Sequence, residues 1–438
     1  CNTSLSIADR VTDLVNRIDD SIKPNLLTAR GHNSQIQAIP ELGVPGYYWG
    51  TNCLHSLNQA SCVNVSISST EWEMRCPTNF PSGPSFGATF DRELIQSMAN
   101  VIGTELRALY LAGSAKGLDC WGSVVNLNRD PRWGRNGEGG LEDAYAMGEL
   151  AAAWTKGFQA PRPVLQNQTD ASFSTSSLSP SSSSSSSSSS ASEEEGTEQR
   201  QLLQGIMTLK HMAANSVENT APFSRHTFDA NSTYGVTPFV LADYYLRPFR
   251  AAISQSELRG VMCSYNAVLG KPTCLSPIIR NTRSQAGFQG YVTSDSDSVN
   301  DATHAHHYTS TPQNATALAL TDGQCDINSG DTYYSNIPKV VQDPSLKATM
   351  KDVDRALFNS LRQRFDLGLF DPQNTYAWPS PAEVGSDASY NLTLKASQEA
   401  LVLLRNDAGL LPLSPGKKRI AVVGPHANAQ EVLIQPYP

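Results

Sequence analysis

The chain has 438 residues, of which 39% are hydrophobic and 17% are charged, and its formal net charge is -8 at pH 7. This length is too great for one ordinary domain and suits a large α/β barrel followed by a smaller unit. The acidic balance argues against binding nucleic acid through bulk charge, and the lack of a run of about 18 apolar residues argues against a transmembrane helix.

The first part of the chain alternates amphipathic helices with short apolar runs. A helix is predicted from Asp91 to Leu111, where apolar residues recur on one face and Asp91 can cap the first turn, and a second from Leu141 to Phe158. Runs with the pattern of buried parallel strands lie at Ser123–Asn128, Gly205–Lys210, Gly260–Tyr265 and Tyr291–Ser294. This alternation predicts an α/β fold with a parallel sheet.

A serine-rich segment interrupts the alternation. Ser181–Ser190 is an unbroken serine run, with Ser/Thr-rich sequence before it and Glu193–Glu195 after it. Such a segment buries too little apolar area to offset the entropy lost on ordering. Residues from about 165 to 198 are therefore predicted to be a disordered surface insertion, favoured as a tolerated loop expansion over a modified regulatory loop.

The end of the chain predicts a second unit. A helix near Lys351 runs to about Phe365 and completes a barrel domain over residues 1–370, and residues 371–393 have the composition of a linker. A helix from Leu394 to Arg405 and a strand from Ile420 to Gly424 are predicted beyond it. Because one helix and one strand cannot close a core, residues 394–438 are expected to be the first elements of an incomplete domain, whose remainder could be a separate partner chain.

The cysteines and the glycosylation sequons favour a secreted protein, either extracellular or in the cell wall. The eight cysteines contain no C-x-x-C pair, so we expect neither a zinc ribbon nor a redox motif. The sequons are Asn2, Asn64, Asn167, Asn231, Asn314 and Asn391. Together they favour the secretory route and some disulfides, and the start at Cys1 is interpreted as that of a mature protein.

An acidic run lies at the end of one predicted strand. Asp295 and Asp297 follow Tyr291–Ser294 directly, and the carboxyl end of a barrel strand is where such folds place their chemistry. A carboxylate there can attack an anomeric carbon. Since the two aspartates are two residues apart, a continuing strand would aim both at the same face, and spacing does not choose between them. A turn or helix N-cap is the competing interpretation.

Cationic side chains follow two other predicted strands. Asn128–Arg135 carries three arginines around a proline and a glycine, and arginine forks bind hydroxyls or hold carboxylates, although a structural salt-bridge loop is the alternative. Lys210 and His211 could bind ring hydroxyls and keep Asp295 ionised, or His211 could be a buried histidine with its own hydrogen bonds. Tyr265 could orient the nucleophile or simply pack.

Two other patterns do not predict a cofactor site. His304, His306 and His307 have no standard zinc-ligand spacing. The glycine-rich stretch Gly134–Gly140 lacks both G-x-G-x-x-G and a Walker lysine. We therefore expect neither a metal nor a cofactor.

Taken in order, these segments resemble glycoside hydrolase family 3. The matching stretches are Asn128–Arg135, Lys210-His211, Val261–Val268 and Tyr291–Asp295, with Leu401–Leu413 and Val422–Pro425 resembling the entry into the family's second domain. The likeness covers nearly the whole chain outside the serine insertion. It implies a TIM-like (β/α)8 barrel followed by an α/β sandwich, and retaining hydrolysis of terminal β-linked sugars.

The resemblance also assigns roles to residues. It places the nucleophile at Asp295 rather than Asp297. It places contacts to sugar hydroxyls at Arg135, Lys210 and His211, and it places Tyr265 beside the nucleophile. It implies a general acid/base glutamate in the second domain, so this residue is not expected in the present chain, and Glu138, Glu142 and Glu218 of the barrel loops are not assigned to it.

The sugar implied by the resemblance is xylose. Members that act on glucosides usually have Trp after the nucleophile, where this chain has Ser296, and the segment from Cys263 to Cys274 resembles the β-xylosidase branch, in which those cysteines tend to pair. Cys62 and Cys76 are the other disulfide candidates. The expected function is release of terminal β-D-xylose from xylo-oligosaccharides in xylan breakdown, with arabinofuranosidase as a candidate side activity. A β-glucosidase of the same family and a non-catalytic sugar-binding product are the alternatives.

Two features depart from the family pattern. Asn52 occupies a place that normally holds a carboxylate, which replaces a charge-assisted hydrogen bond by a neutral one at a cost of roughly 1 kcal/mol. The run after Lys210-His211 also lacks the Gly-His-Gly-Asp sequence of the N-acetylglucosaminidase branch, so that branch is discounted. Without the general acid/base, the chain is expected to be weak or inactive on unactivated substrates.

Overall fold

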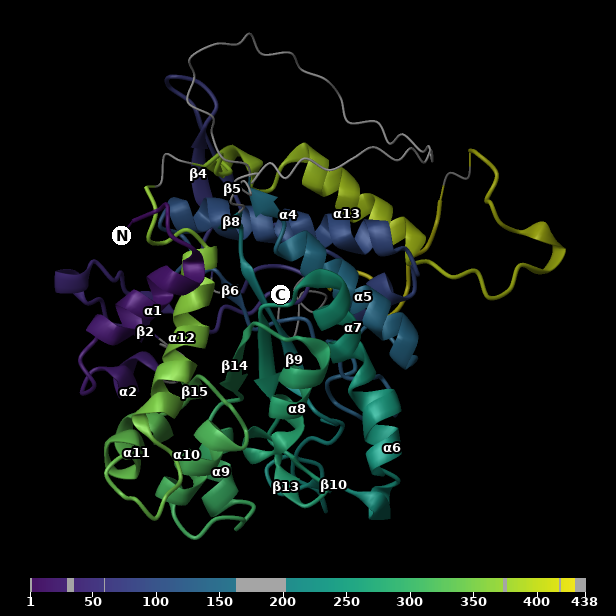
Figure 1. The fold of residues 1–438 in the computed structure, drawn as a ribbon. Helices are drawn as coiled ribbons and strands as arrows, with labels where there is room; N and C mark the ends of the chain where they lie inside the picture. Colours follow the sequence, from purple (N-terminus) through teal and green to yellow (C-terminus); the bar gives the residue numbers. More distant parts are fainter. Residues whose placement is uncertain are drawn as a thin grey trace, which may run out of the picture.

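The structure is a computed structural model that describes residues 2–29, 35–58, 60–162, 202–372, 376–416 and 419–429. The serine-rich segment predicted to be a disordered insertion and the sequon at Asn167 lie outside the described residues. Residues 1–372 that are described carry mixed helices and strands, and the helices surround the strands (Figure 1).

Short parallel strands form the centre of the fold. Four of them are hydrogen-bonded in the order β14 (Tyr291–Ser294), β11 (Gly260–Cys263), β9 (Ile206–Met212) and β6 (Asp119–Cys120). All three pairings are parallel, as the buried apolar runs predicted. The predicted run at Ser123–Asn128 is wrong as a strand, because the φ of Ser123 is 32°, outside the extended region, and Val124 makes only isolated bridges.

Further pairings extend this sheet toward a TIM-like barrel. On one edge Ile327 bridges Thr293 of β14, and β15 (Asn328–Ser329) pairs in parallel with β1 (Thr28–Ala29). On the other edge Thr51 bridges Cys120 of β6, and Thr51 follows β3 (Tyr47–Tyr48), which pairs with β2 (Gln35–Ile36). β1 also contacts β2. The strands therefore curve round toward each other, and the carboxyl ends of the parallel strands face the same side.

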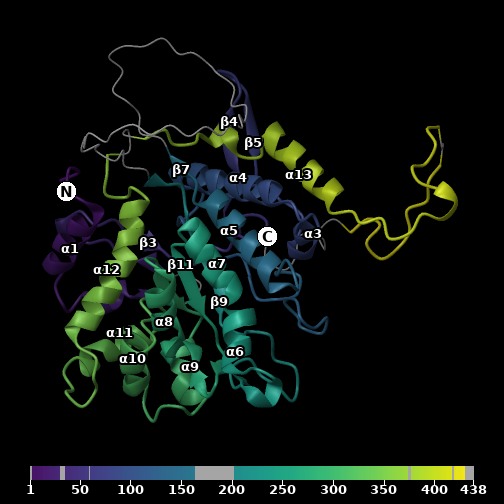
Figure 2. The ribbon, with the colours of Figure 1, turned by 45° about the vertical axis from the view of Figure 1, so that its right-hand side comes forward.

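Helices pack around these strands and against one another. Neighbouring pairs are α4 (Arg92–Leu111) with α5 (Ala144–Phe158), α5 with α7 (Arg247–Ser256), α7 with α8 (Pro277–Ala286), α9 (Ser298–His304) with α10 (Pro312–Thr321), α10 with α11 (Thr332–Val340), and α1 (Ile7–Arg17) with α12 (Met350–Asp366). Shorter helices are α2 (Lys23–Leu26), α3 (Gly83–Gly87) and α6 (Pro238–Val240). In both views α1 and α12 lie on one side of the strands and α5 and α7 on the other (Figures 1 and 2).

The predicted first helix is confirmed, and side-chain caps explain where the first two helices begin. Asp91 accepts a hydrogen bond from the amide of Leu94 at 2.9 Å, so α4 starts at the next residue. Asp143 accepts from the amide of Ala146 at 2.7 Å. The second helix therefore begins at Ala144 rather than at the predicted Leu141.

Small strand pairs, most of them antiparallel, and disulfides hold the connecting loops. The remaining strands are β4 (Val63–Ser66) with β5 (Trp72–Arg75), β7 (Pro161–Arg162) with β8 (Leu202–Leu203), and β12 (Ala267–Val268) between β10 (Asp229–Ala230) and β13 (Lys271–Pro272). The disulfides are Cys62–Cys76, Cys263–Cys274 and Cys53–Cys120. The first two join the cysteines singled out in the sequence. The third was not expected, and it ties the loop after β3 to β6.

The segment after the barrel differs from the prediction. Ser386 accepts a hydrogen bond from the amide of Ser389, so α13 runs from Asp387 to Glu399 and begins inside the predicted linker. The prediction of a helix up to Arg405 and of a strand at Ile420–Gly424 is wrong for these residues. Ile420 is 67% exposed, and the described part of this segment offers no second strand to pair with it.

α13 packs against α4 and α3. The chain beyond it extends away from the helices of the barrel in both views (Figures 1 and 2). The domain boundaries themselves stay a prediction.

A buried carboxylate fixes the strand that leads to the acidic run. The Asp326 side chain is fully buried and pairs with Arg283 and with Arg355, the latter at 3.2 Å. It also accepts hydrogen bonds from the Val292 amide at 2.9 Å and from the Asn359 amide group at 3.0 Å. One carboxylate therefore joins β14 to α8 and α12.

We predict that Asp326→Ala lowers the free energy of unfolding by about 3–5 kcal/mol, because breaking a buried ion pair leaves two cations without their anion. Urea denaturation followed by circular dichroism measures this change. Asp322→Ala is the matched control, because its pair with Arg280 is about half exposed on both sides, and it should cost at most about 1 kcal/mol. Equal losses in the two variants would contradict the prediction.

Candidate active site at the carboxyl ends of the strands

The predicted site residues come together at one end of the parallel strands. Lys210 and His211 belong to β9, Tyr265 follows β11, and Asp295 follows β14. The amide of Asp295 donates to the carbonyl oxygen of Cys263 at 3.0 Å, so the two strand ends are held side by side. Because parallel strands run in one direction, their carboxyl ends share one edge.

The structure separates the two aspartates of the acidic run. β14 ends at Ser294, and Asp297 has φ of 60° at the start of α9, so the expectation that a continuing strand aims both carboxylates at one face is wrong. An ideal Cβ on Gly330 would lie 2.2 Å from Asp297 Oδ1, so this carboxylate lies against Gly330. Burial, Asp301 and Asp331 raise the pKa of Asp297. Asp295 instead faces His211, with Oδ2 3.4 Å from Nε2.

Arg135 is held by a buried carboxylate and reaches the histidine. Its Nε and one terminal nitrogen donate to the two oxygens of Glu138, each at 2.7 Å, and the Glu138 side chain is almost fully buried. Its other terminal nitrogen lies 3.1 Å from His211 Nε2. Burial works against the charge of Arg135, but Glu138 and then Asp295 more than offset this and raise its pKa. Arg135 is therefore a fixed cation beside Asp295.

The tautomer of His211 follows from Asn126. The Asn126 side-chain oxygen accepts from the His211 backbone amide at 2.8 Å and lies 3.1 Å from Nδ1, while its amide nitrogen donates to the His211 carbonyl at 2.9 Å. This pattern assigns the proton to Nδ1 and leaves a lone pair on Nε2. Burial, followed by the charges of Arg135 and Lys210, lowers the pKa of His211 well below its usual value. The contact with Asp295 is therefore not an ion pair.

Lys210 is a buried amine whose charge is easily lost. Burial, followed by the charge of Arg135, lowers its pKa to about 8. Its Nζ donates to the side-chain oxygen of Asn52 at 3.2 Å, which places Asn52 in the same site. The neutral amide at position 52 offers the lysine a hydrogen bond without a compensating charge.

Tyr265 is clamped by two side chains that sequence patterns did not reveal. The guanidinium of Arg225 lies 4.4 Å from the centre of its ring, and the ring of His226 lies 4.5 Å away. His306 Nε2 lies 2.8 Å from the Tyr265 carbonyl oxygen. Burial and the carboxylate of Asp295 raise the pKa of Tyr265, so its hydroxyl stays protonated. Tyr265 is thus a hydrogen-bond donor next to Asp295.

A second layer of polar side chains backs this clamp. Glu218 accepts hydrogen bonds from Trp133 Nε1 at 3.2 Å and from Arg225 at 3.1 Å. No spacing rule would have found Arg225 or His226, which lie in an irregular loop. Asn126 carried a weak signal, because it is a polar residue inside a buried apolar run.

Among the described residues, no group of three histidine, cysteine or acidic side chains is placed to hold a metal ion. In the same part of the chain, no helix combines the length and the apolar character needed to cross a bilayer. The polar cluster around Asp295 can bind hydroxyl groups with Arg135, Lys210 and Tyr265 and can present one carboxylate as a nucleophile.

The chain is similar to known proteins over most or all of its length. Residues 70–361 match the N-terminal domain of glycosyl hydrolase family 3. The chain is 34% identical to "Probable beta-D-xylosidase 7" of Arabidopsis thaliana, over all of this chain and 52% of that protein. It is 32% identical to "Beta-xylosidase/alpha-L-arabinofuranosidase 2" of Medicago sativa subsp. varia, over all of this chain and 51% of that protein. The chain thus spans about half the length of the curated relatives it matches.

Solved structures show the same fold. A GH3 exo-beta-xylosidase (XlnD) in complex with a xylobiose aziridine activity-based probe superposes with a TM-score of 0.74 at 26% identity, over 95% of this chain and 48% of that one. A β-glucosidase from Erythrobacter marinus has a TM-score of 0.69 at 21% identity, over 94% of this chain and 52% of that one. Because the β-glucosidase is only 21% identical to this chain, its likeness supports the fold alone.

We predict that His211 makes the folded state lose stability in acid. Its pKa is about 6.5 in the unfolded chain and well below that in the folded one, so the unfolded state binds more protons between these values. The free energy of unfolding therefore falls as the pH drops below about 6.5, by up to about 1.4 kcal/mol per pH unit from this group.

The test compares urea denaturation from pH 7 to pH 5 in the wild type and in His211→Gln, whose stability should fall less steeply. His426→Gln is the control, because His426 is exposed in the described structure, and it should follow the wild-type curve. A His211→Gln slope equal to that of the wild type would show that His211 is not the buried neutral group described above.

Proposed function

The chain belongs to glycosyl hydrolase family 3, and from this premise we propose that it hydrolyses terminal β-linked sugars with retention, with Asp295 as the nucleophile. The observation that carries this proposal is the position of Asp295, a carboxylate at the end of a barrel strand within reach of His211 and of the Arg135 charge. The proposed substrates are xylo-oligosaccharides, and the product is β-D-xylose. Relatives named as xylosidases and the Cys263–Cys274 disulfide support this choice.

In the proposed first step, a carboxylate oxygen of Asp295 bonds to the anomeric carbon while the bond from that carbon to the glycosidic oxygen breaks. The leaving oxygen takes a proton from the general acid. In the second step a water oxygen bonds to the anomeric carbon, the bond from that carbon to Asp295 breaks, and the water proton passes to the same acid/base group. Arg135 and Lys210 donate hydrogen bonds to ring hydroxyls, and neutral His211 accepts from Arg135 through Nε2 and so holds that donor in place. Tyr265 donates to the nucleophile and orients it.

Proton transfer to the leaving oxygen is the step that the described residues support least. Glu138 is bound on both oxygens by Arg135, Glu218 is bound by Trp133 and Arg225, and Glu142 is exposed beside α5. We therefore propose that the general acid/base lies outside these residues, as the family resemblance implies.

A sugar-binding protein that does not turn over its ligand is the second candidate. The neutral Asn52 in a place that normally holds a carboxylate favours it, as does the engagement of Glu138 and Glu218 by other side chains. This candidate keeps the same ring of donors around Asp295, so only a covalent test distinguishes the two.

We also propose that the protein is secreted and glycosylated. Three disulfides are typical of an oxidising compartment. The sequon asparagines Asn2, Asn64 and Asn391 are exposed and therefore accessible to glycan attachment.

We predict that a 2-deoxy-2-fluoro-xyloside with an activated leaving group adds one sugar mass to the protein, measured by intact mass spectrometry. Asp295→Asn should abolish the adduct. Asp297→Asn is the matched control, because its carboxylate lies against Gly330, and it should still be labelled. Sugar binding without any adduct would favour the non-catalytic candidate. Loss of the adduct in Asp297→Asn but not in Asp295→Asn would show that Asp297, and not Asp295, is the nucleophile.

We predict that the chain cleaves an activated aryl xyloside but is slower on xylobiose by about 10²–10⁴-fold, the usual contribution of general acid catalysis. The aryl leaving group needs little protonation, whereas xylose as a leaving group needs a proton. Initial rates on both substrates, corrected for uncatalysed hydrolysis, measure this ratio. Comparable rates on the two substrates would show that a general acid is present in this chain.

A further inference from the structure

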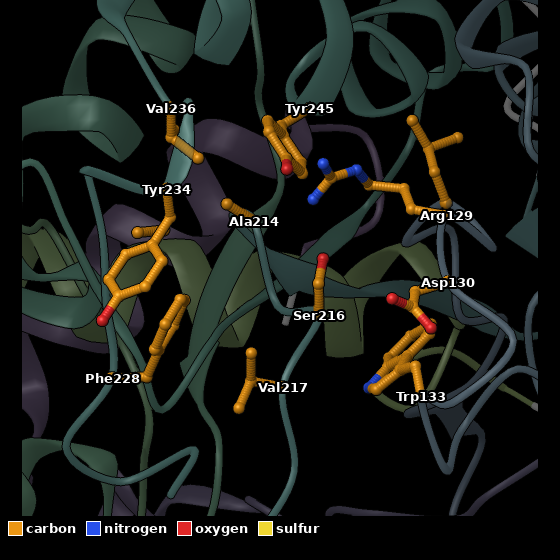
Figure 3. Close-up of a pocket in the computed structure, with 12 residues that line it drawn as sticks. Arg129, Asp130, Trp133, Ala214, Ser216, Val217, Phe228, Tyr234, Val236 and Tyr245 are labelled. Carbon is orange, nitrogen blue, oxygen red and sulfur yellow. The ribbon is translucent and has the colours of Figure 1, made fainter. Parts of the chain in front are cut away.

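A cavity of about 240 Å³ lies beside the candidate active site and is not used by the proposed reaction (Figure 3). Its lining comes from the loop after Val124, from the loop after β9, from the segment around β10 between Phe228 and Val236, and from Tyr245 after α6. The loop after β9 leaves the carboxyl end of that strand, and Val124 bridges Lys210 of β9 in parallel, so the cavity lies at the same end of the barrel as Asp295. Substrate-binding surfaces of such barrels are built from these loops.

Trp133 separates the cavity from the candidate active site. Its side chain lines the cavity, and its Nε1 donates to Glu218 at 3.2 Å. Glu218 in turn accepts from Arg225, which lies over the ring of Tyr265. The two compartments are therefore adjacent and share a hydrogen-bonded partition.

The lining combines aromatic faces with a few fixed polar groups. Tyr245 and Tyr234 face the cavity from two sides, and Tyr234 is 48% exposed with its ring packed 4.9 Å from that of Phe228 (Figure 3). Arg129 and Ser216 point their polar ends toward the space between these rings (Figure 3). A mostly apolar and aromatic lining with few polar groups is typical of ligand pockets, and aromatic side chains give large contact areas to a ring with apolar edges.

Arg129 is available to a ligand in a way that its neighbours are not. Its guanidinium lies 5.2 Å from the centre of the Tyr245 ring and is hydrogen-bonded to the Tyr244 side chain, and no ion pair joins it to a carboxylate in the described part of the chain. The adjacent Asp130 is instead bound on both oxygens by Arg132, at 2.9 and 2.6 Å. Arg129 thus offers a planar set of N–H donors, whereas the negative charge beside it is already compensated.

We propose that this cavity is a second saccharide subsite that binds one sugar ring. Tyr234 and Tyr245 contact its apolar edges, and Arg129 and Ser216 bind its hydroxyls. The volume lies below the roughly 300–1,000 Å³ of pockets for drug-sized ligands, so it fits a single ring rather than a chain. The choice of a sugar as the ligand rests on the proposed function, whereas the presence of the cavity does not depend on that function.

Isothermal titration with xylobiose tests this subsite on the full chain. All proteins carry Asp295→Asn, so that the ligand is not consumed. We expect two binding events in this background and only one in the additional variants Tyr234→Ala and Arg129→Gln, with the lost event weakened at least about tenfold. Tyr390→Ala is the matched control, because this tyrosine is 70% exposed on α13, and it should keep both events.

A further variant separates the two proposals. Lys210→Met should remove the other binding event, which belongs to the site beside Asp295, and keep the one that depends on Tyr234. A single event that neither Tyr234→Ala nor Arg129→Gln weakens would overturn the second subsite. A single event that Tyr234→Ala removes and Lys210→Met leaves intact would contradict the proposed active site but support the inference drawn here.

Discussion

The candidate site depends on the buried pairing of Arg135 with Glu138. Both oxygens of Glu138 are used, so the guanidinium keeps its charge and its direction even though its surroundings are largely dry. That fixed charge acts on its neighbours. It is the second cause, next to burial, of the lowered pKa of Lys210 and of His211, and it faces the carboxylate of Asp295. If Glu138 were absent, a buried cation without its anion would remain, which is costly.

The neutral state of His211 is a consequence of this pairing. An imidazole next to a guanidinium and an ammonium gains nothing from a further positive charge, and Asn126 fixes the remaining proton on Nδ1. The site therefore presents two kinds of group to a ligand. Arg135, Lys210 and Tyr265 are donors, whereas the carboxylate of Asp295 is an acceptor. A ring with several hydroxyls needs both kinds, since each hydroxyl donates and accepts.

The barrel holds these groups through buried contacts far from them. Asp326 joins β14 to α8 and α12, and the Cys263–Cys274 disulfide ties the end of β11 to the loop that follows it. Both strands lead directly to site residues, Asp295 and Tyr265. The loops are less constrained, and it is there that Trp133 and Glu218 divide the carboxyl end of the barrel into two compartments. A rigid strand set with variable loops is the usual way in which this fold carries its binding sites.

The sequence by itself determined several local elements and the position of the acidic run. Periodicity and the Asp91 cap predicted α4, and the buried apolar runs predicted β11 and β14, because burial and capping leave a repeating pattern in neighbouring residues. Local composition was misleading at Asp387, where a cap starts a helix within a linker-like stretch.

Only the tertiary structure decided which groups meet. The Glu138 and Asn126 contacts of the site, the Arg225 clamp and the Cys53–Cys120 disulfide join residues that no spacing rule connects. The structural distinction between Asp295 and Asp297 depends on two contacts along the fold. β14 stops at Ser294, and the Asp297 carboxylate lies against Gly330, which directly follows β15. Partners of this kind are brought together by the packing of the barrel, and a pattern along the chain does not record them.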